Sequence, residues 1–402
     1  MKFSITFCLL IGVISWAFAA EADPTKLSHV IKLKDGKVQG VIEEAAHGHK
    51  VDSYIGIRYG HAKRFEKATS VEPWTETYNA THWRDACPQH GVGVAPNKLP
   101  FHTETISEDC LYLTVTRPHN SHHTNRSVMF WIHGGGYNSG SIFTMAYDGR
   151  YLASQGDVIV VTVQYRLGPF GFLAEESSTK KDHPGNLGLY DALLALRWVH
   201  ENIAHFGGNP HDVTIFGESA GSFAVGSLLL SPLSKGLFHR AIMQSGAPNS
   251  YFGVQTYKEN GEVGKWLGGR VHCNNETAAQ LVDCLKGKTV QELVDGYQWL
   301  TTQNQNFKPV YPESLLPIRP VEALKGGKFN HDVDLMFGTT SHEGSGFVLW
   351  LSPEVHSNQK LTVNTTKDAI KEQMKFFHAG YETEIAQYYT GKLPANATQD
   401  QL

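Results

Sequence analysis

The stretch TIFGESAGS, residues 214–222, places a serine between two glycines directly after an apolar, β-branched run. DVTIF (212–216) predicts a buried strand and AGSFAVGSLLLS (220–231) a helix. A side chain at the apex of a strand, turn and helix projects beyond the carboxyl end of the sheet, where open α/β folds bind ligands. We therefore predict that Ser219 is a nucleophile. A Cβ at Gly217 or Gly221 would clash, because strand and helix approach closely there.

The rest of the chain alternates apolar runs with helical patterns, as an α/β protein does. The segment 186–208 has apolar residues at helical spacing and ends in Gly-Gly, and 30–42 predicts a hairpin that turns at Asp35-Gly36. Four other runs predict buried strands: SVMFWIHGG (127–135), DVIVVTVQYRLG (157–168), RAIMQSG (240–246) and DVDLMFGTT (332–340). This order predicts a mostly parallel sheet with helices on both faces.

A second glycine-rich turn follows the first of these strands. WIHGGG, residues 131–136, brings three glycines to the carboxyl end of a strand. A serine that attacks an ester needs donors for the developing oxyanion, and bare backbone N–H groups supply them. We predict that the N–H groups of Gly135, Gly136 and Ala220 form this oxyanion hole. No Gly-Lys-Ser/Thr follows the run, which disfavours a phosphate-binding loop.

Composition indicates a globular protein, and the first residues indicate export. The 402 residues are 41% hydrophobic with a formal net charge of −4, so neither nucleic acid nor an anionic membrane is an expected partner. Residues 1–19 have a Lys, an apolar middle and Ala17-Phe18-Ala19, the layout of a cleaved secretory signal. A transmembrane anchor is the competing interpretation. We predict a signal peptide over 1–19, one domain over 20–402, and a secreted, extracellular product.

Cysteines and sequons agree with export. Once Cys8 leaves with the signal, four cysteines remain in an oxidising compartment and allow three pairings, with buried thiols as the alternative. We favour sequential pairing because it closes two local loops: Cys87 with Cys110, and Cys273 with Cys284. Glycosylation sequons start at Asn79, Asn125, Asn275, Asn364 and Asn396. No Cys-x-x-Cys or His-Glu-x-x-His pattern occurs, so we expect no metal and no cofactor.

Taken together, the motifs resemble those of the type-B carboxylesterases, the cholinesterase and carboxylesterase family of the α/β-hydrolase fold. Five segments are similar to its signatures in order and spacing, over nearly the whole mature sequence: SEDCLYLTV (107–115), GGGYNSGS (134–141), VTVQYRLGPFGFL (161–173), the segment 185–222 and GLFHRAIMQSGAP (236–248). The resemblance implies a small-molecule ester substrate, the disulfide pairing favoured above, and a Ser, Glu, His triad in that chain order.

In this resemblance the triad acid maps onto Glu343, in TTSHEGSGF (339–347) after the strand DVDLMFG. By sequence alone Glu343 could equally be a solvated loop carboxylate. Glu218, beside the nucleophile, is expected to act on the site electrostatically, with a purely structural role as the alternative.

The family's histidine is the part of the pattern that this sequence does not match. It belongs in a His-Gly motif on the order of a hundred residues beyond the Glu, and the sequence ends at Leu402. His356 and His378 lack the surrounding pattern, and His342 adjoins Glu343 too closely to be oriented by it. We therefore expect a chain that lacks the family's final strand and helices, leaves a sheet edge uncovered and has little activity. His133 is expected to pack or hydrogen-bond near the glycine turn.

Two functions remain open at this stage. The leading one is a serine carboxylic ester hydrolase that works through an acyl-enzyme. The other is a non-catalytic, cholinesterase-like adhesion or ligand-binding ectodomain, which the retained serine and its setting disfavour. The loop between Cys87 and Cys110 contains no tryptophan. The family resemblance implies that cholinesterases hold a quaternary ammonium there by cation–π attraction to an aromatic side chain, so choline esters are disfavoured. Oligomeric state and the particular ester are not indicated by the sequence.

Overall fold

A computed structural model of the chain describes residues 26–91, 105–120, 124–174, 185–250, 253–274, 277–302, 305–343, 362–377, 380–394 and 397–398. Its contacts divide the chain into two units, Met1–Met336 and Phe337–Leu402. The first holds the central sheet, apart from the last two residues of one edge strand, and every residue of the serine turn. Residues 1–19, where a signal peptide is predicted, lie outside the described residues.

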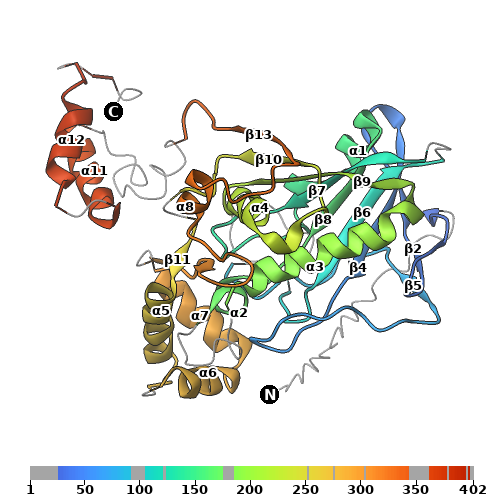
Figure 1. Ribbon diagram of the computed structural model, residues 1–402, viewed down its shortest axis with the longest axis horizontal. Helices are drawn as coiled ribbons and strands as arrows, with labels where there is room; N and C mark the ends of the chain where they lie inside the picture. Colours follow the sequence, from blue (N-terminus) through green and yellow to red (C-terminus); the bar gives the residue numbers. More distant parts are fainter. Residues whose placement is uncertain are drawn as a thin grey trace, which may run out of the picture. The chain divides into compact units, whose positions relative to one another are not determined.

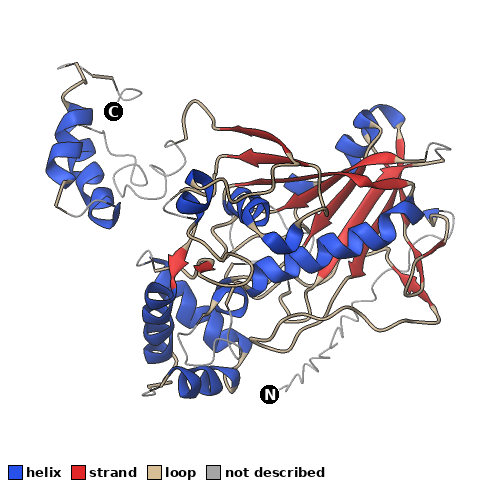
Figure 2. Cartoon of the chain, viewed as in Figure 1, coloured by secondary structure: helices blue, strands red, loops and turns tan. Residues whose placement is uncertain are grey.

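An eight-stranded sheet forms the centre of the first unit (Figures 1 and 2). Its spatial order is β13-β10-β9-β7-β8-β6-β4-β3. The strands are β3 (Val41–Glu44), β4 (Lys50–Arg58), β6 (Tyr112–Pro118), β7 (Arg126–Ile132), β8 (Ile159–Val163), β9 (Gly208–Glu218), β10 (Arg240–Gln244) and β13 (Asp334–Gly338). Strands β10, β9, β7 and β8 run parallel, whereas β6, β4 and β3 pair antiparallel. The parallel part confirms the predicted α/β arrangement and carries the serine turn.

Helices cover both faces of this sheet. Alternate residues of each strand point to opposite sides, so apolar side chains on both faces need to be buried. On one face the core includes Phe130 and Val161 together with residues of α3 (Leu187–Asn202) and α4 (Ala220–Leu230). On the other face Val160 packs with Ala153 of α1 (Arg150–Gly156). Figure 1 shows α3 lying across the strands. The apolar runs are therefore nearly continuous because both sides of the parallel strands are buried.

Two smaller sheets and further helices surround this centre. The smaller strands are β1 (Ile31–Lys32), β2 (Lys37–Gln39), β5 (Thr77–Asn79), β11 (Gln255–Thr256) and β12 (Val310–Tyr311). The other α-helices of the first unit are α2 (Gly168–Phe172), α5 (Tyr257–Arg270), α6 (Ala278–Lys286), α7 (Val290–Thr302) and α8 (Pro320–Lys325). Short 3₁₀ turns are η2 (Ala46–Gly48), η3 (Met145–Tyr147), η4 (Ile203–Phe206) and η5 (Pro232–Ser234). The second unit contains α11 (Val363–Phe377) and α12 (Glu382–Thr390).

The predicted hairpin is present but is shorter than its pattern. β1 and β2 pair antiparallel, with Ile31 opposite Val38, around the expected Asp35-Gly36 turn. The chain then leaves this sheet at Gly40, where a Cβ would stand 2.2 Å from the carbonyl oxygen of Ser53. Residues after Gly40 form β3 of the central sheet instead. One alternating run therefore serves two sheets.

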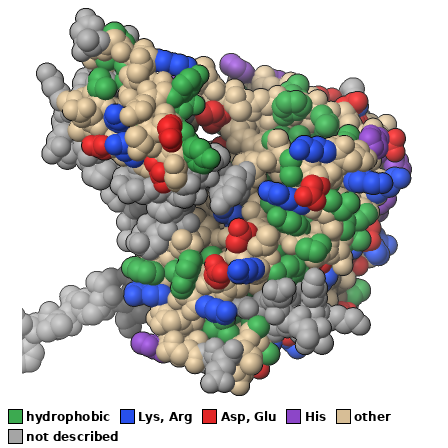
Figure 3. All heavy atoms as spheres, turned by 60° about the vertical axis from the view of Figure 1, so that its left-hand side comes forward, with side chains coloured by type: hydrophobic (Ala, Val, Ile, Leu, Met, Phe, Trp, Pro, Cys, Tyr) green, Lys and Arg blue, Asp and Glu red, His purple; other side chains and the backbone are tan. Residues whose placement is uncertain are grey.

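Strand β13 lies at one edge of the central sheet, and all five of its residues are exposed. These include the apolar side chains of Leu335, Met336 and Phe337. Over the face drawn in Figure 3, basic and acidic side chains are interspersed. In the described ranges, no helix has both the length and the apolar character needed to cross a bilayer.

Candidate active site

Ser219 lies at the point where β9 ends and α4 begins, in a strained backbone conformation. Its φ of 54° and ψ of −121° fall in a region that residues with a Cβ rarely adopt. Such strain costs on the order of 1–3 kcal/mol and persists only where the surroundings determine it. The side chain is half-buried, and its hydroxyl makes no hydrogen bond with any described residue. The turn therefore presents a hydroxyl that its own fold does not use.

Crowding enforces this turn, as the two glycines predict. A Cβ on Gly221 would lie 2.1 Å from the carbonyl oxygen of Ile132, at the end of β7. A Cβ on Gly217 would lie 2.6 Å from the backbone of Gly221. Strand end, turn and neighbouring strand thus touch through bare backbone, which only glycine permits.

The end of β10 fixes the turn from the other side. The N–H of Ser219 donates to the carbonyl oxygen of Gln244 at 2.9 Å, and the Ser222 hydroxyl donates to that of Gly246 at 2.7 Å. Within α4, the N–H of Phe223 donates to the carbonyl oxygen of Ser219 at 3.0 Å. The position of Ser219 is therefore set by two neighbouring strands and one helix.

The glycine turn after β7 lies directly against the nucleophile. A Cβ built on Gly134 would be 3.3 Å from the Cβ of Ser219 and 2.7 Å from the carbonyl oxygen of Glu218. Gly135 and Gly136 have φ values of +104° and +64° and are exposed. Among the described residues, no acceptor takes the N–H of Gly135, Gly136 or Ala220. These N–H groups are thus available to a ligand beside Ser219.

Side chains hold both ends of this turn. The Nδ1–H of His133 donates to the carbonyl oxygen of Gly134 at 2.9 Å. At the other end, the Gln89 carboxamide accepts from the N–H of Gly140 at 2.8 Å and donates to its carbonyl oxygen at 2.7 Å. Gln89 is buried. No sequence pattern marks Gln89, because its contacts lie 51 residues away along the chain.

His133 is completely buried between two tyrosines. Its ring stacks on Tyr165 with centroids 4.4 Å apart, and Tyr147 lies parallel at 6.5 Å. Burial lowers the pKa of His133 to about 4, so the imidazole is neutral at physiological pH. Its Nε2 atom has no hydrogen-bond partner in the described structure. The expected packing and hydrogen-bonding role of His133 is therefore confirmed.

The carboxylate of Glu218 is exposed and close to this turn. A Cβ on Gly134 would lie 2.8 Å from its Oε2 atom. Burial and the charge of Glu218 together raise the pKa of Tyr147. The charge of Glu218 thus influences Tyr147, and the predicted electrostatic role of Glu218 in the site stays a prediction.

Glu343 belongs to the second unit and is described within it. Its Oε1 atom accepts from the N–H of Thr340 at 2.8 Å, and the side chain is exposed. Neighbouring His342 contacts the Ser341 hydroxyl through Nδ1 at 3.0 Å. His356 and His378 lie outside the described residues. The triad role of Glu343 stays a prediction.

The structure contains both expected disulfides. Cys87 and Cys110 are joined with Cα atoms 5.0 Å apart, and Cys273 and Cys284 with Cα atoms 5.7 Å apart. The first disulfide lies two residues from Gln89. Most of the loop that it closes, residues 92–104, lies outside the described residues.

Three of the predicted glycosylation residues fall in the described part of the chain, and each is exposed: Asn79, Asn125 and Asn364. Asn275 and Asn396 lie outside it. In the ranges that the structure describes, no group of three or more His, Cys, Asp or Glu side chains could hold a metal ion.

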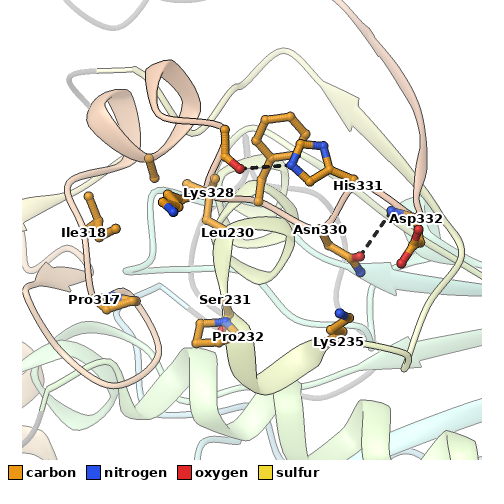
Figure 4. A pocket seen from close by; sticks show the side chains of 13 residues that line it. Leu230, Ser231, Pro232, Lys235, Pro317, Ile318, Lys328, Asn330, His331 and Asp332 are labelled. Carbon is orange, nitrogen blue, oxygen red and sulfur yellow. Dashed lines mark hydrogen bonds between the residues drawn. The ribbon is translucent and has the colours of Figure 1, made fainter.

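Two hollows lie near these elements. One of about 180 Å³ borders the glycine turn at Asn138 and Ser139 and reaches Phe170 and Tyr297. A larger one of about 400 Å³ lies at the carboxyl end of α4, the opposite end from Ser219 (Figure 4). An eleven-residue helix is about 16 Å long, so this hollow is separate from the serine turn.

Comparison with known proteins gives the class and then the family. The match to the carboxylesterase family covers residues 27–401, and the fold is that of the α/β-hydrolases. The chain belongs to the carboxylesterase family.

Its relatives include three acetylcholinesterases. That of Danio rerio is 38% identical over 92% of this chain and 60% of its own length. That of Electrophorus electricus is 37% identical over 92% of this chain and 60% of its own. That of Bungarus fasciatus is 36% identical over 80% of this chain and 54% of its own. The chain thus spans somewhat over half the length of these curated relatives.

Proposed function

We propose that this chain carries the nucleophile and oxyanion donors of a secreted serine carboxylic ester hydrolase. The observation that carries the proposal is the unbonded Ser219 hydroxyl on a strained turn against a glycine segment with unused N–H groups. Family membership supports ester hydrolysis as the reaction class. The proposed substrate is a small-molecule ester.

The proposed reaction proceeds through an acyl-enzyme. Ser219 Oγ attacks the ester carbonyl carbon while a base accepts the hydroxyl proton. The carbonyl oxygen becomes an oxyanion, which accepts from the N–H groups of Gly135, Gly136 and Ala220. The carbon–oxygen bond to the alcohol then breaks, and the alcohol leaves with the proton. Water attacks the resulting ester of Ser219 by the same route and releases the acid.

The base in this proposal is a histidine oriented by Glu343, as the family resemblance implies. No described histidine hydrogen-bonds to Ser219. Loss of a triad member lowers turnover by on the order of 10⁶. We therefore expect turnover to depend steeply on such a base.

The test combines a covalent probe with turnover. The protein is treated with a fluorophosphonate and analysed by intact mass, and then assayed with p-nitrophenyl acetate. We expect labelling at Ser219, loss of labelling in Ser219→Ala, and unchanged labelling in the control Ser154→Ala, whose serine lies on α1 away from the turn. A folded protein that is neither labelled nor active would contradict the proposal and favour a binding ectodomain.

A further inference from the structure

His133 hydrogen-bonds to a peptide group that also carries one of the proposed oxyanion donors. The carbonyl of Gly134 and the N–H of Gly135 belong to the same planar unit, and the bond between them is trans. In a trans peptide these two groups point in opposite directions. A hydrogen bond that fixes the carbonyl therefore also fixes where the N–H points.

This peptide needs such a bond because glycines flank it on both sides. Rotating a peptide plane by half a turn changes ψ of the residue before it and φ of the residue after it. For most residues sterics oppose that change, but glycine accepts both signs of φ about equally. The Gly134–Gly135 peptide is thus free of the usual steric restraint against flipping, and the His133 hydrogen bond supplies a restraint in its place.

The imidazole is itself held in one place and one tautomer. A carbonyl oxygen only accepts, so Nδ1 must carry the proton that bonds to Gly134. The ring stacks on Tyr165, whose hydroxyl donates to the His133 carbonyl oxygen at 2.8 Å. Behind it, a Cβ on Gly140 would stand 2.5 Å from Nδ1, so the returning chain leaves the ring no room to swing.

Protonation cannot readily switch this arrangement off. Nε2 is buried without a partner in the described structure, so a second N–H there would have no acceptor. The tyrosines that face the ring, Tyr147 and Tyr165, have raised pKa values and stay neutral. The imidazole therefore remains a single-proton donor aimed at Gly134.

We propose that His133 is a positioning residue that sets the direction of the Gly135 N–H by holding the Gly134 carbonyl toward the core. Its contribution is the orientation of an oxyanion donor, and it takes no part in proton transfer. The chemical meaning of this inference rests on the proposed ester hydrolysis, whereas the restraint on the turn can be measured without any reaction.

Two substitutions separate hydrogen bonding from packing. His133→Phe keeps an aromatic ring on Tyr165 but has no donor for Gly134. His133→Asn removes the ring but keeps an N–H near the position of Nδ1. We expect the rate of Ser219 phosphonylation, and kcat for p-nitrophenyl acetate, to fall about 10²-fold in His133→Phe, the effect of losing one oxyanion donor. In His133→Asn both should stay within about tenfold of wild type, with KM little changed in either variant.

The melting temperatures of the two variants should follow the opposite order to their rates. Because His133→Asn leaves a cavity beside Tyr165, it should melt at a lower temperature than His133→Phe. A rate order that follows the melting temperatures, with Asn worse than Phe, would mean that His133 only fills space and would overturn the inference.

Hydrogen–deuterium exchange gives a second readout that needs no activity. The N–H groups of Asn138 and Ser139 both donate to the Gly135 carbonyl oxygen, so they report on the turn. Exchange over 133–140 should be faster in His133→Phe than in wild type or His133→Asn. Equal exchange in the three proteins, or fastest exchange in His133→Asn, would overturn the inference. Absence of labelling and turnover in wild type, with the expected exchange order, would instead contradict only the proposed function.

Discussion

Two turns meet at the carboxyl ends of adjacent strands, and they are held in different ways. The turn at Ser219 is fixed by backbone crowding, because Gly217 and Gly221 touch other main chain directly. The turn at Gly135 and Gly136 is exposed, and side chains of His133 and Gln89 hold it at its ends. A nucleophile on a strained residue needs surroundings that leave no alternative. The N–H donors of the glycine turn need side chains to hold the turn, because glycine accepts both signs of φ about equally.

The largest effect should come from breaking the crowded turn. Gly221→Ala places a Cβ 2.1 Å from the carbonyl oxygen of Ile132, which backbone cannot relieve without moving β7 or α4. We expect a loss of about 4 kcal/mol or more in the free energy of unfolding, measured by urea denaturation, together with loss of Ser219 labelling.

Gly269→Ala is the matched control for that change. Gly269 lies in α5, where an added Cβ meets nothing closer than 3.9 Å. This variant should be about 0.5–1 kcal/mol more stable than wild type, since alanine favours a helix. Similar destabilisation by both alanines would show that crowding does not hold the serine turn.

A substitution in the exposed turn should slow the phosphonylation of Ser219 while the protein stays folded. Gly135→Ala forces a side chain into a φ of +104° and places its Cβ 2.1 Å from the carbonyl oxygen of Ser139. This clash lies within the turn itself, so the turn can shift without moving a strand of the central sheet. We expect Ser219 phosphonylation to slow by about 10²- to 10³-fold, equivalent to about 3–4 kcal/mol, while the chain stays folded. The rate is measured with a fluorophosphonate and folding by circular dichroism. Unaltered phosphonylation would remove Gly135 from the proposed oxyanion hole.

Acid should weaken the fold through His133. Its pKa is about 4 in the folded protein, against an ordinary value of 6.5. This contribution to stability is fully present above pH 6.5. As the pH falls toward 4, His133 becomes protonated in the unfolded chain but stays neutral in the folded chain. The free energy of unfolding therefore falls by up to about 3 kcal/mol. Urea unfolding of wild type and His133→Phe at pH 7, 5 and 4 measures the difference. Parallel pH profiles for the two proteins would contradict the burial of a neutral imidazole.

A smaller effect should follow from loosening the second clamp. Gln89→Met keeps the length of the side chain but leaves the backbone groups of Gly140 without their partners. We expect a loss of about 2 kcal/mol in the free energy of unfolding and roughly tenfold slower phosphonylation. Gln89→Glu restores an acceptor for the Gly140 N–H but no donor for its carbonyl, so it should not recover the rate. Full recovery in that variant would argue against a two-point clamp.

The sequence predicts the crowded turn far better than the clamped one. The serine turn is predicted because its serine and glycines are adjacent in sequence. The parallel strands are predicted because burial on both faces gives each a long apolar run. Strand β4 was not predicted, since Asp52 and Ser53 interrupt its apolar pattern although both are buried. Asp52 is tolerated there because Arg117 and His119, from a neighbouring strand and the residue that follows it, bind its carboxylate. Gln89 was not predicted either, because its hydrogen-bond partners at Gly140 are distant in sequence.

The disulfide between Cys87 and Cys110 makes the glycine turn sensitive to reducing conditions. Gln89 follows Cys87 by two residues and also donates to its carbonyl oxygen at 3.1 Å, so the crosslink to Cys110 anchors the carboxamide that holds Gly140. Thiol reductants in a purification buffer should therefore slow Ser219 chemistry without touching the serine. Batches prepared with and without dithiothreitol would then differ in specific activity at equal protein concentration, and reoxidation would bring them together.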